Sequence, residues 1–192
     1  YFESDYKEAL KSFERVKDDP VYSLVVPYYF ANIYFSQGKY QEVVDYTEPL
    51  IDNTRLNYYN ELNQLIGKAY FNLKQYSKAL PYLEYYLEKQ RKGTDNDYYQ
   101  VAFCQFKLDQ PEQALVYLEK IRGTGDSLAQ HADYLEGRCL LDLDKKAEAR
   151  NAFQEAASKG VDERVREHAS FNYGKLSYEL GYYPAAVSSL KD

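Results

Sequence analysis

Small and large apolar residues recur along this chain at intervals of about 35 residues. In the first example Gly67 is followed twelve positions later by Ala79, and Leu83 comes four positions after that. This spacing predicts two antiparallel helices, because small residues let the helices approach closely while large ones fill the space around them. The same triplet occurs three more times, as Ala102, Ala114 and Leu118; as Gly137, Ala149 and Phe153; and as Gly174, Ala186 and Leu190.

Prolines and loops agree with this alternation of helices. Pro111 and Pro184 fall where second helices of a pair should begin, a position at which the missing amide hydrogen costs little. Pro49 stands further along a predicted helix and is expected to bend it. The charged, glycine-containing stretches 90–97 and 122–127 separate successive pairs and are typical of connectors between repeats, not of linkers between domains.

The pattern resembles the tetratricopeptide repeat, a helix-turn-helix unit of about 34 residues. That family carries small residues at positions 8 and 20, aromatic residues near positions 11 and 17, and a large residue at position 24. The resemblance implies an all-α fold, a right-handed α-solenoid of about eleven helices that forms a single array over 1–192. Its parts are a lone second helix in 1–23, full repeats in 24–59, 60–94, 95–129 and 130–166, and a partial repeat in 167–192.

Neither end of this array carries the polar cap that terminal repeats normally need. The sequence also begins abruptly, without an initiating methionine, at "YFESDYKEAL". We therefore expect the chain to be a fragment of a longer polypeptide, or its exposed ends to pack on something, with self-association through these ends as one possibility.

Composition narrows the classes of partner. The net charge of −6 and the pI near 5.1 argue against general nucleic-acid binding and against a membrane-surface role, both of which need clustered cations. No apolar run is long enough to span a bilayer, so direct membrane insertion is not expected. Tyrosine is the main large apolar residue: the sequence has 23 tyrosines but no Trp and no Met.

Candidate catalytic and metal-binding residues are few. His131 and His168 share position 2 of neighbouring repeats, but two ligands with no obvious third do not make a zinc site, so we interpret them as groove-lining or surface histidines. Cys104 and Cys139 share position 10, where a small half-buried residue explains them better than a nucleophile does. The stretch "GTGD" at 123–126 lacks the lysine of a phosphate loop. We expect no enzyme activity, no metal and no cofactor.

A second stripe of residues remains on each first helix once the packing positions are assigned. Positions 5, 9 and 12 point about a third of a turn away from positions 7, 8 and 11, and in tetratricopeptide arrays they line the concave channel. Positions 5 and 12 are mostly aromatic here, and position 9 is often polar or basic. The alternative is that these residues only support the scaffold. The predicted partner-binding groove consists of Tyr28, Asn32, Phe35, Gln64, Lys68, Phe71, Tyr99, Phe103, Phe106, Tyr134, Arg138, Phe171, Lys175 and Tyr178.

These residues predict a non-enzymatic interaction scaffold that holds an extended or helical segment of a protein partner. The chaperone-tail-binding members of the family use a two-carboxylate clamp, of which only Asn32 is present. Other residues, Tyr28, Leu65, Asn96 and Gln100, occupy the remaining clamp positions, so that activity is not expected. Two alternatives remain open: an architectural spacer or oligomerisation segment, and a sensor array attached to an enzymatic or DNA-binding domain.

The texture of the repeats, as in "IYFSQGKYQEVV", is similar to that of bacterial tetratricopeptide proteins of the cell envelope. This similarity favours the periplasm or cell envelope over the cytoplasm.

Overall fold

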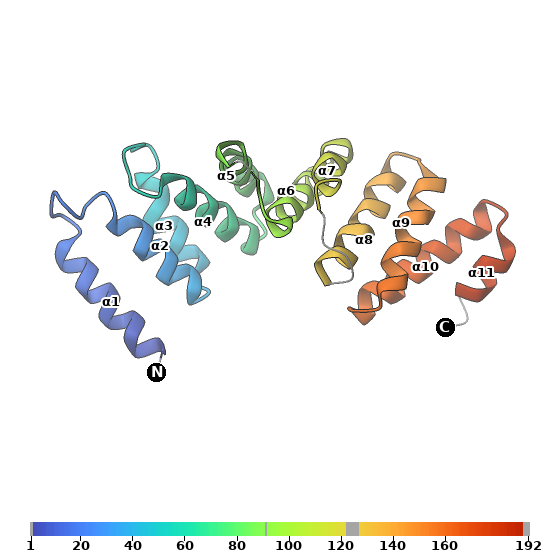
Figure 1. Cartoon of the computed structure of the whole chain (residues 1–192), viewed down its shortest axis with the longest axis horizontal. Coiled ribbons are helices and arrows are strands. Elements are labelled where there is room, and N and C mark those ends of the chain that lie inside the picture. Colours follow the sequence, from blue (N-terminus) through green and yellow to red (C-terminus); the bar gives the residue numbers. More distant parts are fainter. Residues whose placement is uncertain (1, 91, 122–126, 190–192) are drawn as a thin grey trace. The chain divides into compact units, whose positions relative to one another are not determined.

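The computed structural model describes residues 2–90, 92–121 and 127–189. Within these ranges the chain forms eleven α-helices and one short 3-10 helix, and no strand (Figure 1). The all-helical fold expected from the sequence is therefore confirmed. Contacts between residues divide the chain into two compact units, Tyr1–Lys92 and Gly93–Asp192, and each is described by itself.

The first unit is built from antiparallel helices that pack on their neighbours in the sequence. Helix α2 contacts α1, α3 and α4, and α4 contacts α5 (Figure 1). The bounds are α1 (Phe2–Val16), α2 (Val26–Ser36), α3 (Tyr40–Thr47), η1 (Glu48–Leu50), α4 (Tyr59–Asn72) and α5 (Tyr76–Lys89).

The second unit repeats the same arrangement three times. Each first helix contacts its own second helix and also the next first helix, so that α6, α8 and α10 are neighbours in turn. Contacts between these first helices bring side chains from successive repeats to one face. The bounds are α6 (Asp95–Lys107), α7 (Pro111–Leu118), α8 (Ser127–Asp142), α9 (Lys146–Lys159), α10 (Glu163–Glu179) and α11 (Tyr183–Ser189).

The small residues do bring the helices of a pair together, as expected. A Cβ atom placed on Gly137 would lie 2.7 Å from Cε1 of Phe153, and one on Gly67 would lie 2.8 Å from the side chain of Leu83. Phe153 and Leu83 are both fully buried, with 0% and 1% of their surface exposed to solvent. The second small residue of each pair, Ala79, Ala114, Ala149 or Ala186, is buried as well. Leu190, the large residue of the last triplet, lies outside the described residues.

The turn between the two helices of each pair has one conformation throughout the array. Its central residue always has a positive φ, between 56° and 85°. In each turn the following residue donates its amide hydrogen to a carbonyl in the last turn of the first helix; the Lys145 N–H, for example, lies 2.9 Å from the Leu140 carbonyl. This is the hydrogen bond of a helix C-terminal cap. The residues with positive φ are Gly38, Lys74, Asp109, Asp144 and Gly181, all at position 15 of their repeats.

Two of the proline predictions are confirmed and one needs refinement. Pro111 begins α7, and Pro184 is the second residue of α11. Pro49 was expected to bend a helix, but α3 ends at Thr47 and a 3-10 turn, Glu48–Leu50, follows it. The proline cannot donate the amide hydrogen bond that would continue the α-helix, and its ring clashes with the preceding turn.

We expect Gly137→Ala to lower the free energy of unfolding by about 1–3 kcal/mol, because its methyl group overlaps the Phe153 ring. An alanine without such a neighbour would stabilise a helix by roughly 1 kcal/mol relative to glycine. The double variant Gly137→Ala/Phe153→Leu copies the natural pair Ala102 and Leu118. Urea denaturation should show a smaller loss for this double variant than the sum of the two single losses; strict additivity would contradict the packing.

Asp109→Gly should raise the free energy of unfolding by about 0.5–1 kcal/mol, because glycine adopts a positive φ without the Cβ clash of an L-residue. Glu112→Gly, on the exposed side of α7, is the matched control and should lower it by about 1 kcal/mol. Thermal denaturation of both variants gives the comparison, and a loss of stability for Asp109→Gly would show that its left-handed conformation carries no strain.

Candidate functional site

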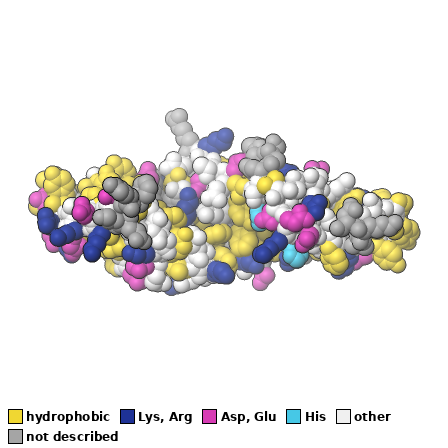
Figure 2. All heavy atoms as spheres, turned by 90° about the horizontal axis from the view of Figure 1, so that it is seen from below, with side chains coloured by type: hydrophobic (Ala, Val, Ile, Leu, Met, Phe, Trp, Pro, Cys, Tyr) yellow, Lys and Arg dark blue, Asp and Glu magenta, His cyan; other side chains and the backbone are white. Residues whose placement is uncertain are grey.

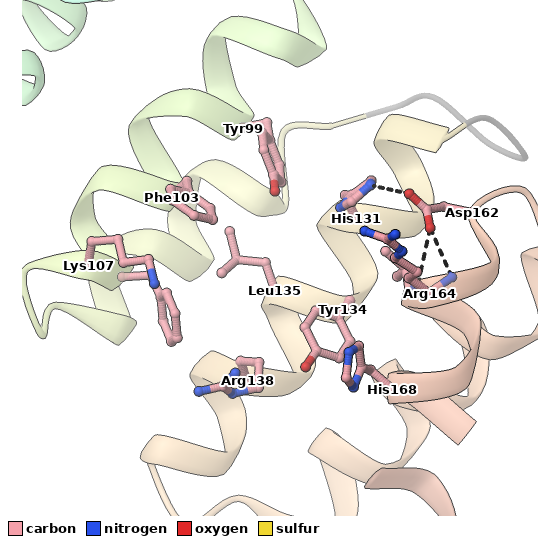
Figure 3. Close-up of a pocket in the computed structure, with 12 residues that line it drawn as sticks. Tyr99, Phe103, Lys107, His131, Tyr134, Leu135, Arg138, Asp162, Arg164 and His168 are labelled. Carbon is pink, nitrogen blue, oxygen red and sulfur yellow. Dashed lines mark hydrogen bonds and ion pairs between the residues drawn. The ribbon is translucent and has the colours of Figure 1, made fainter. Parts of the chain in front are cut away.

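A cavity of about 340 Å³ opens between the first helices of the second unit. Figure 3 shows side chains from α6, α8 and α10 directed toward this common space. Its volume is at the lower end of the range of ligand pockets, about 300–1,000 Å³. The lining residues are Tyr99, Phe103, Phe106 and Lys107 from α6, His131, Tyr134, Leu135 and Arg138 from α8, and Asp162, Arg164, Val165 and His168 from the start of α10 and the residue before it.

The floor of the pocket is apolar. Leu135 is buried and so is Val165, at 4% and 8% exposure. Tyr99 and Phe103 form a pair of rings with centroids 5.9 Å apart and remain half-buried. Half-exposed rings over buried aliphatic side chains offer a large contact area to a ligand with little loss of side-chain entropy.

Aromatic residues at position 5 of one repeat meet histidines at position 2 of the next. The rings of Tyr99 and His131 are 6.5 Å apart, and so are those of Tyr134 and His168. Both histidines line the pocket, as the groove-lining interpretation expected. The two histidines belong to different ring contacts (Figure 3), and His131 pairs with the carboxylate of Asp162.

Asp162 fixes the rim of the pocket beside His131. Its Oδ1 atom accepts hydrogen bonds from the backbone N–H groups of Arg164 and Val165, 3.0 and 3.3 Å away, and so caps the N-terminus of α10. Its Oδ2 atom lies 3.3 Å from Nε2 of His131. The Val165 N–H in particular holds the pKa of the Asp162 carboxyl below its usual range, so this group stays a carboxylate.

Gln130 holds the loop that carries Asp162. This side chain is fully buried, and its amide makes four hydrogen bonds to backbone groups. Its Nε2 donates to the carbonyls of Ala156 and Asp162, at 3.1 and 3.2 Å. Its Oε1 accepts from the N–H groups of Val161 and Asp162, at 3.1 and 2.6 Å. One side chain from α8 therefore sets where α10 begins.

Two cations of the pocket rest on aromatic rings. The Lys107 Nζ atom lies 5.3 Å from the centre of the Phe103 ring and 5.6 Å from that of Phe106. The guanidinium carbon of Arg138 lies 5.4 Å from the centre of the Phe106 ring. Cations in this position are attracted by the negative face of the ring. The rings thus hold both positive charges at the mouth of the pocket.

The structure brings five of the predicted groove residues together in this pocket. They are Tyr99, Phe103, Phe106, Tyr134 and Arg138. All belong to the two repeats whose first helices, α6 and α8, are in contact.

Three other aromatic residues of the stripe pack within their own repeats. The rings of Phe35, Phe71 and Tyr178 meet a tyrosine of the following helix edge to face, at 5.3, 5.8 and 5.6 Å between centroids. Their partners are Tyr40, Tyr76 and Tyr183. Position 12 therefore packs on position 17 where both are aromatic. In the repeat with Phe106, position 17 is Pro111, and Phe106 lines the pocket instead.

The remaining stripe residues lie outside the pocket. Asn32 donates a hydrogen bond of 3.2 Å from its amide to the Tyr28 hydroxyl. Gln64 and Lys68 are half-buried on α4. Phe171 and Lys175 are exposed on α10, and the Phe171 side chain reaches 59% exposure.

The groove predicted from the sequence does not include Lys107, Leu135 or the segment 162–165. Lys107 and Leu135 each follow a stripe residue directly, at positions 13 and 6. Asp162 comes before the repeat boundary at 167, but α10 begins at Glu163. The signal that could have located this rim is the sequence "VDERV", in which an aspartate precedes a helical run in the manner of an N-cap.

The two cysteines are more deeply buried than expected. Both are fully excluded from solvent, and neither forms a disulfide. Burial raises the pKa of the Cys139 thiol to about 12, so at neutral pH it is not a thiolate. Within 2–90, 92–121 and 127–189 no group of three or more His, Cys, Asp and Glu residues could hold a metal ion. The stretch 123–126, considered as a phosphate loop, lies outside the described residues.

Figure 2 shows the two histidines at the surface, next to apolar side chains and to charges of both signs. In the part of the chain that the structure describes, no helix combines the length and the apolar character required to cross a bilayer.

Comparison with known proteins identifies the fold. The family model described as anaphase-promoting complex, cyclosome, subunit 3 matches residues 72–156, which is less than half of the chain. No curated protein gives a significant match in sequence. Solved structures match much more of the chain.

YrrB, described as "a TPR protein with an unusual peptide-binding site", has 18% identity and a TM-score of 0.73 over 93% of this chain and 89% of its own. MamA from Desulfovibrio magneticus RS-1 has 18% identity and a TM-score of 0.65, over 84% and 87% of the two chains. BtubC from P. vanneervenii has 12% identity and a TM-score of 0.66, over 98% and 86%. The chain has the fold of a tetratricopeptide-repeat array.

This identification confirms the expected α-solenoid of helix-turn-helix repeats. At such low identities these solved structures establish the fold alone, and any use of the pocket must be argued from its own residues.

We expect Gln130→Leu to lower the free energy of unfolding by about 2–4 kcal/mol, since it leaves several buried backbone groups without a hydrogen-bond partner. Amide hydrogen exchange at Val161 and Asp162 should become faster. Gln154→Leu, on the exposed side of α9, should change stability by less than about 0.5 kcal/mol. Unchanged exchange at Val161 and Asp162 in Gln130→Leu would show that another contact fixes the loop.

Proposed function

We propose that this chain is a protein–protein interaction scaffold that binds a segment of a partner protein in the pocket of its second unit. The observation that carries the proposal is the pocket itself, in which three successive first helices supply an apolar floor and a rim of hydrogen-bond donors. Aromatic and arginine side chains concentrated at one concave site are typical of the residues that dominate binding energy in interfaces.

The dimensions support a segment as the ligand in place of a folded surface. A cavity of about 340 Å³ accommodates one or two side chains of a peptide. The backbone of such a peptide would then run past Arg138, Arg164 and the histidines, which can donate hydrogen bonds to its carbonyl groups. The structural neighbour YrrB is described as having a peptide-binding site, which agrees with this use of the fold.

A second candidate function, an oligomerisation or spacer segment, is favoured by another surface. Helices α10 and α11 expose large apolar side chains: Tyr178 at 66%, Tyr183 at 58% and Val187 at 55%. Contiguous exposed apolar residues of this size mark contact surfaces. For location we keep the proposal of the bacterial periplasm or cell envelope, which rests on the texture of the repeats.

The double variant Tyr99→Ala/Arg138→Ala should abolish peptide binding without unfolding the array, because both residues line the pocket and neither is fully buried. Peptides selected from a random library on the purified chain provide the ligands, and fluorescence anisotropy measures their affinity. We expect at least a hundredfold weaker binding, corresponding to about 2.7 kcal/mol.

The matched control is Tyr183→Ala/Arg166→Ala, which removes the same residue types from α10 and α11 outside the pocket. This control should bind the selected peptides like the unmodified chain. Circular dichroism of all three proteins verifies that the helices remain. The pocket is the wrong site if both double variants bind equally well, and the proposed function fails if selection enriches no peptide.

A further inference from the structure

We infer that the ligand of this pocket is an acidic peptide segment that carries one large apolar side chain. This inference rests on the proposed function and adds the chemistry of the partner. It depends on three features: the charges around the pocket, the state of its cations, and the shape of its floor.

The charge of the pocket is opposite to that of the chain as a whole. The full sequence carries a net charge of −6. The pocket is nevertheless lined by three permanent cations, Lys107, Arg138 and Arg164, against a single carboxylate, Asp162. Such a local reversal of sign directs an anionic ligand to this place on the surface.

Helix α8 separates the two signs of charge by its phase. His131, Tyr134 and Arg138 are spaced three and four residues apart and face the pocket. Asp133 and Glu136 lie on the opposite side of the helix, where they border another surface hollow together with Glu155. These two carboxylates of α8 are therefore turned away from the pocket, and its cationic side is left for the ligand.

The cations of the pocket are available to a ligand. Within the described residues, neither Lys107, Arg138 nor Arg164 forms an ion pair with a carboxylate of the chain. Lys107 and Arg138 are held over aromatic rings instead. A cation on a ring keeps its charge and its donor groups, so it can pair with a carboxylate that approaches from the open side.

The one carboxylate of the rim is already occupied. Both oxygens of Asp162 have partners in the chain: the N–H groups of Arg164 and Val165 on one side and His131 on the other. Its negative charge is therefore partly balanced within the rim and does not cancel the field of the three cations.

The floor specifies the apolar part of the ligand. Leu135 and Val165 are buried beneath the half-exposed rings of Tyr99, Phe103 and Tyr134. Burying a Leu or Phe side chain on such a floor favours binding through the hydrophobic effect. The ligand thus places an apolar residue at the centre and its carboxylates around it.

The arrangement differs from the two-carboxylate clamp of chaperone-tail binders. The cations here stand at positions 9, 13 and 35 of their repeats, whereas the clamp requires cations at positions 2, 5 and 6. The ligand's acidic side chains, distributed on both sides of the apolar anchor, are the groups recognised here.

Fluorescein-labelled synthetic peptides test this inference on the purified chain. The first has a central Phe flanked by Asp and Glu, and the second has Asn and Gln in their place. We expect the acidic peptide to bind about tenfold more tightly than its amide counterpart, as three partly exposed charge pairs would provide. Raising the salt concentration from 0.05 to 0.5 M should remove most of this difference.

Charge reversal provides the decisive comparison. Lys107→Glu/Arg138→Glu should lose the acidic peptide and gain a Lys-containing peptide around the same central Phe. Lys145→Glu, on an exposed residue outside the pocket, is the control and should retain the original preference. A single-stranded oligo(dT) of similar charge is included because it is anionic and carries rings that can stack.

The outcomes separate the inference from the function on which it rests. Preference for the acidic peptide with reversal in the double variant supports the inference. It is overturned if library-selected peptides are neutral or basic, if the amide peptide binds equally, or if oligo(dT) binds more tightly at this pocket than the acidic peptide. In the first two cases the scaffold function stands and only the partner chemistry is wrong, whereas failure to select any peptide removes both.

Discussion

The close approach of two antiparallel helices within each repeat is the constraint on which this structure depends. It is clearest at Gly137, where the Phe153 ring occupies the space that a Cβ atom would need. Gly67 and Leu83 make the same contact in another repeat. Because the interior of a protein is tightly packed, this contact fixes the distance between the helices. It thereby also fixes the positions of the side chains on both helices. The left-handed turn at position 15 closes each pair at the same place.

The pocket follows from this packing. Once each second helix is held by its own first helix, the first helices α6, α8 and α10 come into contact one after another and present one face together. Tyr99 meets His131 there, and Tyr134 meets His168, so each repeat completes the surface of the one before it. The residues that line the pocket thus come from segments more than 60 residues apart in the sequence, and no single repeat could form it.

The sequence predicts the helices and their packing residues well because these depend on spacing within one repeat. Burial of Ala149 and Phe153 is an example. The sequence predicts the pocket less well, because whether a side chain lines the pocket depends on which residues pack beside it. Phe71 and Phe106 share position 12, but a tyrosine five residues later takes up the ring of Phe71, and a proline stands there after Phe106. The left-handed turns show a related limit: Gly38 and Gly181 signal them, whereas Lys74 at the same position does not.

Gln130 gives the connection between α9 and α10 a property that ordinary loops lack. Most connections between helices tolerate changes in length, since their ends are fixed only by the helices that they join. Here one buried amide contacts Ala156, in the last turn of α9, and Asp162, directly before α10. An inserted or deleted residue between them would break these bonds and displace the cap of α10. The length of this loop is therefore as strictly determined as the identity of a core residue. The repeat that contains it has the longest interval of the array, 37 residues between the repeat starts at 130 and 167, and this length is fixed as well.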